Sequence, residues 1–305
     1  LLDVIRPRLF ILAETELWPN LLLALQARQI PLAIVNGRIS NRTFPRYLAA
    51  KRLFAPLLTI PSKILVQTER DRERYIAVGA NPLRVQVTGS TKYAQRQVRT
   101  LVGESERLSL KFGLRHDAPL LVLGSVRPGE DEAVVKAYAA VLREFPALQL
   151  IVAPRHPERF DAVAELLRRE GVRFTRRSLQ AGERSQVVLL DTIGELVEAY
   201  SIATLSYVGG TLVPVGGHNP LEPAAFGTPV LMGPHYGNVT DAVDELLERG
   251  GVSIVNDGES LQHALLSLLR DRPRCERQGR AAYEVWERNS TALERVLPEL
   301  LTLLP

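Results

Sequence analysis

Short, continuous apolar runs alternate with longer amphipathic stretches along almost the whole chain, and this alternation limits the possible folds more than any other feature. Ten runs of four to six residues have the length of strands: 9–13, 32–36, 64–67, 84–88, 120–124, 148–153, 187–190, 203–208, 229–233 and 252–255. Continuous apolar runs are typical of strands in a parallel sheet that is covered on both faces. The stretches between them, such as 131–143, 157–170 and 261–269, have the pattern of helices. The order predicts an α/β fold built of doubly wound parallel sheets.

A chain of 305 residues has room for two such domains, at about 150 residues each. A polar, helix-like stretch near residues 94–113 separates the first four runs from the other six. We expect an N-terminal Rossmann-like domain over residues 1–93, a second Rossmann-like domain over 94–290, and a C-terminal helix over 291–305 that Pro298 kinks. Doubly wound domains usually have more than four strands, and the sequence starts at Leu1 rather than Met. We therefore expect the first domain to be incomplete.

Composition excludes several classes of protein. The 38 basic and 34 acidic residues leave a net charge of +4, which is too small to indicate a nucleic-acid partner. The single cysteine, Cys275, excludes a disulfide framework and a cysteine-based metal cluster, and it fits a reducing compartment. The five histidines lack the spacing of metal ligands, so we expect neither a bound metal nor another cofactor. No apolar run approaches the roughly 18 residues of a membrane-spanning helix.

Ligands of doubly wound sheets bind at the carboxyl ends of the strands, so the loops that follow strands are the first candidates for a site. After the run 203–208, two glycine pairs lead to Asn219-Pro220-Leu221-Glu222. Asn219 can cap a helix, Pro220 suits its first position, and Glu222 stands where a capping box needs an acid. Such a helix start offers free amides to a phosphate. The alternative is a capping box in which the glycines serve only the path of the chain.

Three other loops follow strands of the second half. Arg155 follows the run 148–153 after Pro154, and residues 191–195 follow the run 187–190. The Arg155 guanidinium suits phosphate, and the backbone amides of residues 191–195 could contact a base. Arg127 lies in the third loop, after the run 120–124. Taken alone, each has an ordinary alternative, such as a solvated arginine or acids in a first helical turn.

Charged residues also follow strands of the first half. Glu14 and Glu16 come directly after the run 9–13, where carboxylates can serve acid–base or positioning roles or simply begin a helix. Lys92 ends the segment Gly89-Ser90-Thr91-Lys92 after the fourth run, and a lysine there could stabilise charge on a leaving phosphate. The segment lacks the Walker pattern and is no P-loop.

Five cations stand between residues 36 and 53 without an acid among them: Arg38, Arg42, Arg46, Lys51 and Arg52. Such a run is often a solvated face. The alternative is a seat for an anionic substrate at a membrane surface.

These loops, taken together and in this order, resemble the Kdo transferases of lipopolysaccharide assembly (3-deoxy-D-manno-octulosonic acid transferases). The resemblance covers essentially the whole chain. The matching segments are 14–21 (ETELWPNL), 36–40 (NGRIS), 89–93 (GSTKY), 153–160 (APRHPERF), 191–196 (DTIGEL) and 207–234, which contains GGHNPLEPAAFGTPVLMGP.

The resemblance implies a two-domain GT-B glycosyltransferase fold and an inverting transfer of Kdo from CMP-Kdo to lipid A precursor (lipid IVA), at the cytoplasmic face of the bacterial inner membrane. It implies transition-state stabilisation by Glu14 and Lys92. It also implies contacts with CMP from the following residues: Pro154, Arg155, Ile193, Gly194, Glu195, Asn219, Pro220, Leu221 and Glu222.

The sequence departs from the family pattern in two places. Val126-Arg127 stands where relatives often have Thr-His. Family members also begin with a membrane-anchoring helix and a segment that carries a glutamate as catalytic base, and no position here matches that stretch. We therefore expect the general base to lie outside this chain and the chain alone to be inactive.

Two other kinds of function remain as alternatives. A UDP-sugar transferase or a nucleotide-sugar epimerase would have the same fold, although the segments 153–160 and 191–196 disfavour both. A sugar-nucleotide-binding module without turnover is the alternative from a different class.

Overall fold

The computed structural model describes residues 2–40, 43–91, 101, 103–179 and 184–304. They form two compact units, one of Leu1–Gln95 with Arg288–Pro305 and one of Arg96–Glu287. The helix expected over 291–305 thus belongs to the first unit. Each unit contains one sheet in which every strand pair is parallel.

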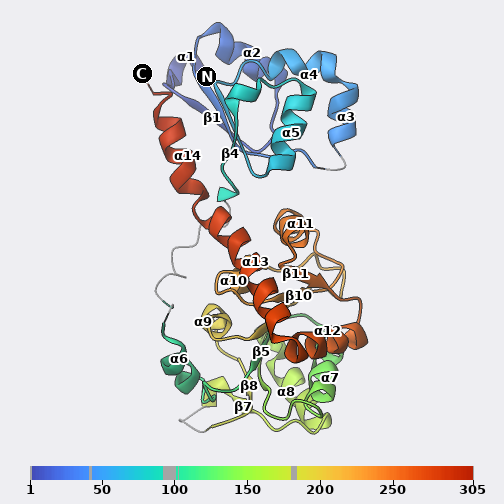
Figure 1. Ribbon diagram of the computed structural model, residues 1–305. Helices are drawn as coiled ribbons and strands as arrows, with labels where there is room; N and C mark the ends of the chain where they lie inside the picture. Colours follow the sequence, from blue (N-terminus) through green and yellow to red (C-terminus); the bar gives the residue numbers. More distant parts are fainter. Residues whose placement is uncertain (1, 41–42, 92–100, 102, 180–183, 305) are drawn as a thin grey trace. The chain divides into compact units, whose positions relative to one another are not determined.

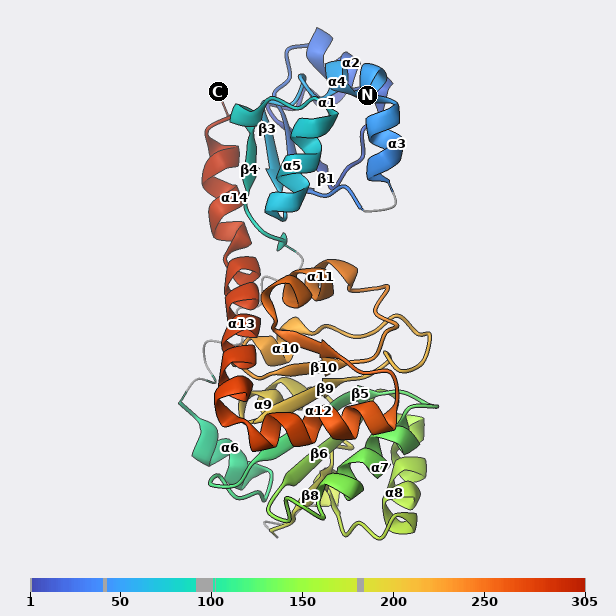
Figure 2. The same ribbon diagram turned by 45° about the vertical axis from the view of Figure 1, so that its right-hand side comes forward.

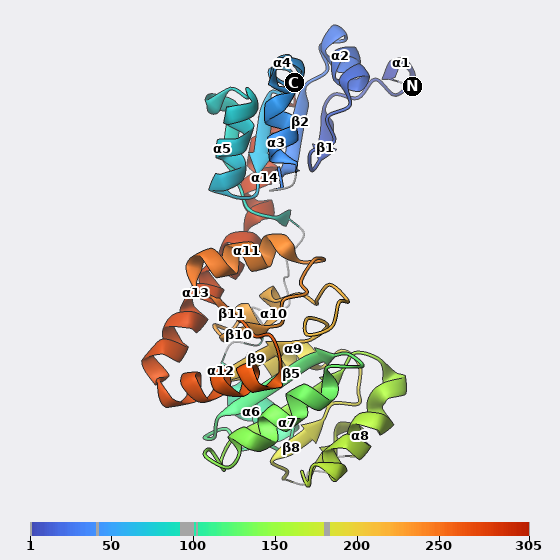
Figure 3. The same cartoon turned by 90° about the vertical axis from the view of Figure 1, so that its right-hand side faces the viewer.

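The first unit has a four-stranded sheet in the order β1-β2-β3-β4. Figure 3 shows β1 at its outer edge. The elements are α1 (Leu2–Ile5), β1 (Phe10–Ala13), α2 (Pro19–Ala27), β2 (Leu32–Gly37), α3 (Phe44–Ala49), α4 (Lys51–Leu57), β3 (Lys63–Val66), α5 (Glu69–Val78), β4 (Val85–Val87) and α14 (Ala292–Leu301).

Helices from distant parts of the chain cover the two faces of this sheet. On one face, Leu22 and Leu25 of α2 and Tyr75 of α5 pack with Ile34 and other inward side chains of the strands. On the other face, α14 brings residues from the end of the chain, and its Val296 packs against Val35 and Leu65 (Figure 1). Polar contacts reinforce this second interface, because the Arg295 guanidinium donates to the carbonyl of Thr88 and Lys63 pairs with Glu299.

The second unit has a seven-stranded sheet in the order β11-β10-β9-β5-β6-β8-β7. Its elements are α6 (Ser105–Lys111), β5 (Leu120–Val126), α7 (Asp131–Val141), β6 (Gln149–Pro154), α8 (Phe160–Arg169), β7 (Thr175–Arg176), β8 (Val187–Leu189), α9 (Leu196–Ser201), β9 (Leu205–Val208), α10 (Leu221–Ala224), β10 (Val230–Met232), α11 (Thr240–Arg249), β11 (Val252–Ile254), α12 (Gly258–Arg270) and α13 (Arg272–Ser290), whose last three residues belong to the first unit.

Strand β5 shows why the apolar runs of this unit are continuous. Its Leu121 and Leu123 point into a core formed with α7, α8 and α12, which lie together on one face of the sheet (Figure 2). Leu120 and Val122, which alternate with them along the strand, point into a second core, where α6 and α9 cover the other face. Both faces are buried, so every position of the strand is apolar or small.

All ten strands expected from the sequence are present, with ends that differ by one or two residues. The two-residue edge strand β7 was not expected. The stretch 94–113 is described in part, and its described residues form the short helix α6; the rest lies outside the described residues. Among the described residues, no helix combines the length and the apolar character needed to cross a membrane.

Candidate functional site

The order of the second sheet reverses between β5 and β9, and this reversal places the candidate donor site. From β5 the chain winds outward through β6, and at β9 it returns to the other side of β5. At such a switch point the loops after the two central strands diverge and leave room for a ligand. Here the two loops are the β5–α7 loop around Arg127 and the β9–α10 loop that begins at Gly209, and they touch where they leave the strands. The amide of Gly209 donates to the carbonyl of Gly124, 2.8 Å away.

A cluster of basic side chains lies on these two loops and on the loop after β6. Arg127 donates from Nε to His218 Nε2 at 3.1 Å, and its Nη1 lies 2.6 Å from His156 Nε2. A guanidinium can only donate, so both Nε2 atoms accept and each imidazole carries its proton on Nδ1. Arg155, next to His156 at the end of β6, is exposed, and its amide donates to the carbonyl of Val126 at 2.9 Å.

The cluster holds His218 in its neutral form. Burial, together with the positive charges of Arg127 and Arg155, lowers the pKa of His218 to about 4. At neutral pH the site therefore carries the charges of its two arginines and offers the neutral imidazole N–H of His218 beside them. Such a set of donors fits an anion, and phosphate in particular.

The segment Asn219–Glu222 differs in part from the expectation. The side chain of Asn219 does accept from the amide of Leu221, at 3.0 Å. However, the helix begins at Leu221 rather than Pro220 and is only four residues long, so its dipole contributes little. Burial raises the pKa of the half-buried Glu222, while the charge of Arg155 and a hydrogen bond with the Asn219 side chain oppose that rise. Glu222 and Arg155 therefore lie within electrostatic reach of each other.

The loop after β8 has an exposed backbone at residues 193 and 194, whereas the carboxylate of Glu195 is held by neighbouring side chains. Ile193 is 87% exposed, and Gly194 has φ +92°, a conformation that glycine adopts readily. Burial raises the pKa of Glu195, but hydrogen bonds from Thr192, Lys111 and Arg177 outweigh it and lower the pKa to about 2. These three donors hold the carboxylate. The peptide groups of Ile193 and Gly194 remain accessible for a ligand.

In the first unit, Glu14 lies at the carboxyl end of β1 in a strained conformation. Its φ is +62°, and its amide donates to the carbonyl of Val35 at 2.8 Å. The next residue, Thr15, contacts the amide of Arg38 at 3.1 Å and the hydroxyl of Tyr75 at 3.0 Å. Non-glycine residues with positive φ cost free energy and often occur at functional sites. The strain is consistent with a carboxylate held in one position.

The loop after β4 is tied to β2 and to the end of the chain. The amide of Thr91 donates to the Asn36 side chain at 2.9 Å, and that of Ser90 donates to the Asn289 side chain at 2.8 Å. Asn36, like Glu14, has a positive φ, of 61°. The next residue along the loop, Lys92, lies outside the described residues.

The basic run is exposed in its second half. Arg46 on α3 and Lys51 and Arg52 at the start of α4 are exposed, and they are interspersed with Leu48, 44% exposed, and Leu53, 60% exposed. Arg38 is partly buried, and Arg42 lies outside the described residues.

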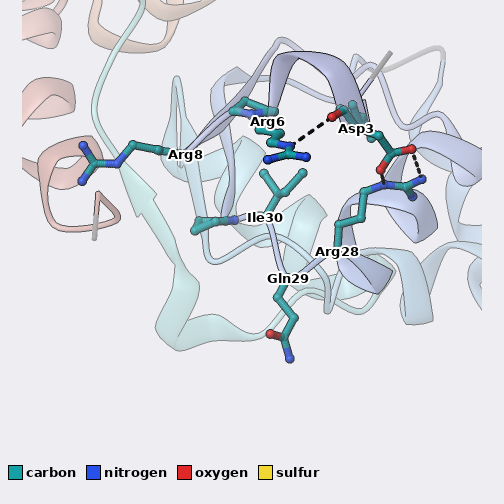
Figure 4. Close-up of a pocket in the computed structure, with 9 residues that line it drawn as sticks. Asp3, Arg6, Arg8, Arg28, Gln29 and Ile30 are labelled. Carbon is teal, nitrogen blue, oxygen red and sulfur yellow. Dashed lines mark hydrogen bonds and ion pairs between the residues drawn. The ribbon is translucent and has the colours of Figure 1, made fainter.

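A pocket of about 410 Å³ in the first unit contains none of the expected site residues. It lies where the chain enters β1 and where α2 turns into β2, and its wall includes the ion pair of Arg28 with Asp3 at 2.8 Å (Figure 4). This is the amino end of the strands, whereas ligands of parallel sheets bind at the carboxyl end. Among the described residues no group of three or more His, Cys, Asp or Glu side chains could hold a metal.

Sequence reasoning missed three residues of the second unit: His156, His218 and Glu130. Both histidines stand inside motifs that were noticed, but nothing local indicates that they contact the same arginine. Glu130 precedes an apolar helix and therefore has the appearance of an ordinary first-turn acid. Only the meeting of the loops after β5, β6 and β9 reveals these contacts.

The fold and the loops define the class first. Two α/β units, each with a parallel sheet, form the GT-B fold of glycosyltransferases. Known structures with the same arrangement include a UDP-GlcNAc 2-epimerase from Neisseria meningitidis, at a TM-score of 0.64 and 14% identity over 99% of this chain and 77% of that one. The C-terminal CMP-Kdo binding domain of WaaA from Acinetobacter baumannii matches 61% of this chain and 98% of its own, at a TM-score of 0.57 and 31% identity.

The sequence comparisons then give the family. The family model of 3-deoxy-D-manno-octulosonic-acid transferases (Kdo transferases) matches residues 1–95, and that of glycosyl transferases group 1 matches 132–285. A 3-deoxy-D-manno-octulosonic acid transferase of Haemophilus influenzae is 39% identical over 97% of this chain, which spans 70% of that protein. The one from Bordetella pertussis is 32% identical over 96% of this chain and 69% of its own length. The chain belongs to the Kdo transferase family and is a glycosyltransferase.

Proposed function

We propose that this chain transfers Kdo from CMP-Kdo to lipid A precursor (lipid IVA) during lipopolysaccharide synthesis, with inversion at the anomeric carbon, and that its second unit binds the donor. The observation that carries the proposal is the cluster of Arg127, Arg155, His156 and His218 at the switch point of the second sheet. The family membership and the described CMP-Kdo binding of the related Acinetobacter domain support the choice of nucleotide.

In this proposal each loop contacts a different part of CMP. Arg155, with Pro154 before it, contacts the phosphate, for which a guanidinium has matching geometry. The exposed peptide groups of residues 193–195 contact the cytosine, because backbone donors and acceptors can read a base edge. The residues 219–222 contact the ribose, and the Glu222 carboxylate accepts from its hydroxyls.

The chemical step separates CMP from the sugar. Breaking this bond leaves positive, oxocarbenium-like charge on Kdo and negative charge on the departing phosphate. Groups that stabilise these charges only as they develop lower the barrier selectively. We assign Glu14 to the sugar and Lys92 to the phosphate.

Replacement of Arg155 tests the donor site. Arg155→Ala removes a charged donor to the phosphate, so the Kd for CMP should rise by about 10- to 100-fold. Titration calorimetry on the 305-residue chain measures it, with UDP as the competing nucleotide. Arg143→Ala is the matched control, because Arg143 is also exposed but precedes β6, at the opposite end of the strand. Equal Kd values for Arg155→Ala and the wild type would remove Arg155 from the site, and a preference for UDP would favour the UDP-sugar alternative.

We further propose that the basic run of the first unit meets the acceptor at the cytoplasmic face of the inner membrane. Lipid A precursor carries phosphates in an anionic leaflet, which attracts each exposed cation by about 1 kcal/mol. Arg46, Lys51 and Arg52 supply cations, and Leu48 and Leu53 supply exposed apolar contacts.

Changing Arg46, Lys51 and Arg52 together to Ser tests this surface. Less of the variant should co-sediment with anionic vesicles, and the apparent KM for the acceptor should rise. The Kd for CMP should stay unchanged. The difference should shrink as salt rises, since screening weakens the wild-type attraction. Equal vesicle binding at low salt would identify the run as a solvated face.

A module that binds CMP-sugars without turnover is the alternative function. Radiolabelled transfer to lipid A precursor decides between the two, measured for residues 1–305 and for the same chain with any residues that precede Leu1 in its gene. CMP binding without transfer in both forms would establish the binding module.

A further inference from the structure

The carboxylate of Glu130 is completely buried between the two loops of the switch point. Its Oε2 accepts from the hydroxyl of Tyr207 at 2.9 Å and from the amides of Thr211 and Leu212 at 3.2 and 3.1 Å. Its Oε1 accepts from the amides of Arg127, at 2.9 Å, and Gly210. Five donors thus surround one carboxylate, and within the described part of the chain it makes no ion pair.

This arrangement is unusual for a first-turn acid. Glu130 stands at the N-cap position of α7, yet its side chain makes no capping bond to that helix. Four of its five donors come instead from residues 207–212, which are 77 to 82 positions away in the sequence. Burying a carboxylate costs free energy unless hydrogen bonds replace its water. Here those bonds hold a distant glycine loop.

One oxygen joins the two loops directly. Oε1 accepts from Arg127 of the β5–α7 loop and from Gly210 of the β9–α10 loop. The loops are so close that a Cβ on Gly209 would lie 2.5 Å from the carbonyl oxygen of Ser125 and 2.7 Å from Oε1. Only glycine fits at this position.

The basic cluster lies directly on the joined segment. A Cβ on Gly210 would lie 3.3 Å from His218 Cδ2 and 3.5 Å from Arg127 Cγ, so the backbone of Gly210 supports both side chains. Gly217, next to His218, donates its amide to the carbonyl of Gly210 at 2.9 Å. The position of Gly210 therefore sets the geometry of the Arg127–His218 contact.

We propose that Glu130 is a positioning residue for the anion subsite of the donor: its carboxylate fixes the two switch-point loops at the separation in which Arg127 and His218 together face the phosphate. The proposal rests on the proposed function, since it assigns that subsite to the nucleotide donor. Glu130 itself contacts no substrate in this role and acts through Arg127 and Gly210.

The test is Glu130→Gln in the 305-residue chain. The amide side chain has nearly the same shape, but its NH2 group faces backbone N–H donors and leaves at least one of them without an acceptor. Because a buried unsatisfied donor is costly, the Kd for CMP should rise by about tenfold or more. Calorimetry is done at a temperature at which circular dichroism shows the variant folded. Glu132→Gln is the matched control, since Glu132 is an exposed acid two residues further along α7 that pairs with Lys136.

Two further measurements separate positioning from a merely structural role. Hydrogen exchange at the amides of Arg127, Gly210, Thr211 and Leu212 should accelerate in Glu130→Gln and stay slow in Glu132→Gln. In an Arg127→Ala background, Glu130→Gln should change the Kd by no more than about twofold, because residues that act through one another are not additive. A structural role would lower the melting temperature and leave the Kd of the folded variant unchanged.

A folded Glu130→Gln variant whose Kd for CMP lies within about twofold of the wild type would overturn the proposal. An equal rise in Kd in the wild-type and the Arg127→Ala backgrounds would overturn it as well. If Glu130→Gln does not fold, Glu130→Asp replaces it. Aspartate keeps the charge but is one methylene too short to reach both loops, so an unchanged Kd in that variant would also refute the role. If the wild-type chain did not bind CMP, the proposed function would fail instead, and the exchange rates alone would decide whether Glu130 holds the loops.

Discussion

The two units use the same architecture with different strand orders. In the first unit the described strands follow the order of the chain, β1-β2-β3-β4, so successive loops lie side by side along the carboxyl edge. In the second unit the order reverses between β5 and β9, and loops that are far apart in sequence meet there. The same strand–helix rhythm therefore produces a row of neighbouring loops in one unit and a convergent site in the other.

The difference appears most clearly in two glutamates, each of which follows the first strand of its sheet. Glu14 is exposed, in a strained backbone conformation, where a carboxylate can meet a ligand. Glu130 is fully buried, with five hydrogen-bond donors around it. Acids in the loops that follow these two strands thus take different roles, one presented to solvent and the other holding loops. Surroundings, and not residue type, decide the role.

Glu14→Gln should give the largest effect and test most directly whether the exposed glutamate acts on the substrate. If Glu14 stabilises charge on the sugar, its neutral isostere should lower the transfer rate by about 10²- to 10³-fold. The Kd for CMP should not change, because the second unit binds the donor. Transfer of radiolabelled Kdo to lipid A precursor measures the rate, in whichever of the two forms of the chain named above shows transfer. Glu16→Gln is the control, an exposed acid of the same loop that accepts from Trp18. Wild-type transfer by Glu14→Gln would exclude the role.

His218 should make the stability of the second unit sensitive to acid. Its pKa is lowered from 6.5 to about 4 in the folded chain, so between these values the unfolded state binds more protons. Stability from this residue is fully present above pH 6.5 and is lost as the pH falls toward 4, by about 1–3 kcal/mol. His218→Gln should flatten this part of the curve.

Urea unfolding between pH 4 and 7 checks this prediction, using the transition that CMP shifts to higher denaturant. His263→Gln, which changes an exposed histidine on α12, should leave the wild-type curve unaltered. Parallel curves for His218→Gln and the wild type would contradict the assigned ionisation.

Glu222→Gln should give the smallest effect and sharpen the account of the donor site. An amide can replace most of the contact with Asn219, so the free energy of unfolding should change by no more than about 1 kcal/mol. If the carboxylate accepts from the ribose, the Kd for CMP should still rise several-fold, because a neutral amide is the weaker acceptor. Calorimetry beside thermal unfolding separates the two quantities. An unchanged Kd would leave Glu222 with a role in the turn only.

Local pattern was sufficient for most of the fold. All ten expected strands are present. Central strands such as β2, β5 and β6 are buried along their whole length, whereas the edge strand β1 leaves Ile11 exposed. The edge strand β7 was missed because Thr175 and Arg176 form no apolar run and pair on one side only. The start of α10 was misplaced by one residue: Asn219 caps the amide of Leu221 as expected, but Pro220 takes the N-cap position and the helix begins at Leu221.

Local sequence was enough to identify the residues at strand ends, because the apolar pattern marks where each strand stops and the chain leaves the sheet. This placed Arg155, Glu14 and residues 219–222 in loops that follow strands, and those loops carried the family resemblance. Which of these loops lie side by side became clear only from the order of the strands in the folded sheet. The contact of Arg127 with His218, and the five donors around Glu130, depend on β9 lying beside β5, and strand order follows from the packing of whole helices on a sheet and not from local pattern. For the same reason the sequence could not show that a helix from the end of the chain, α14, covers a sheet formed at its beginning.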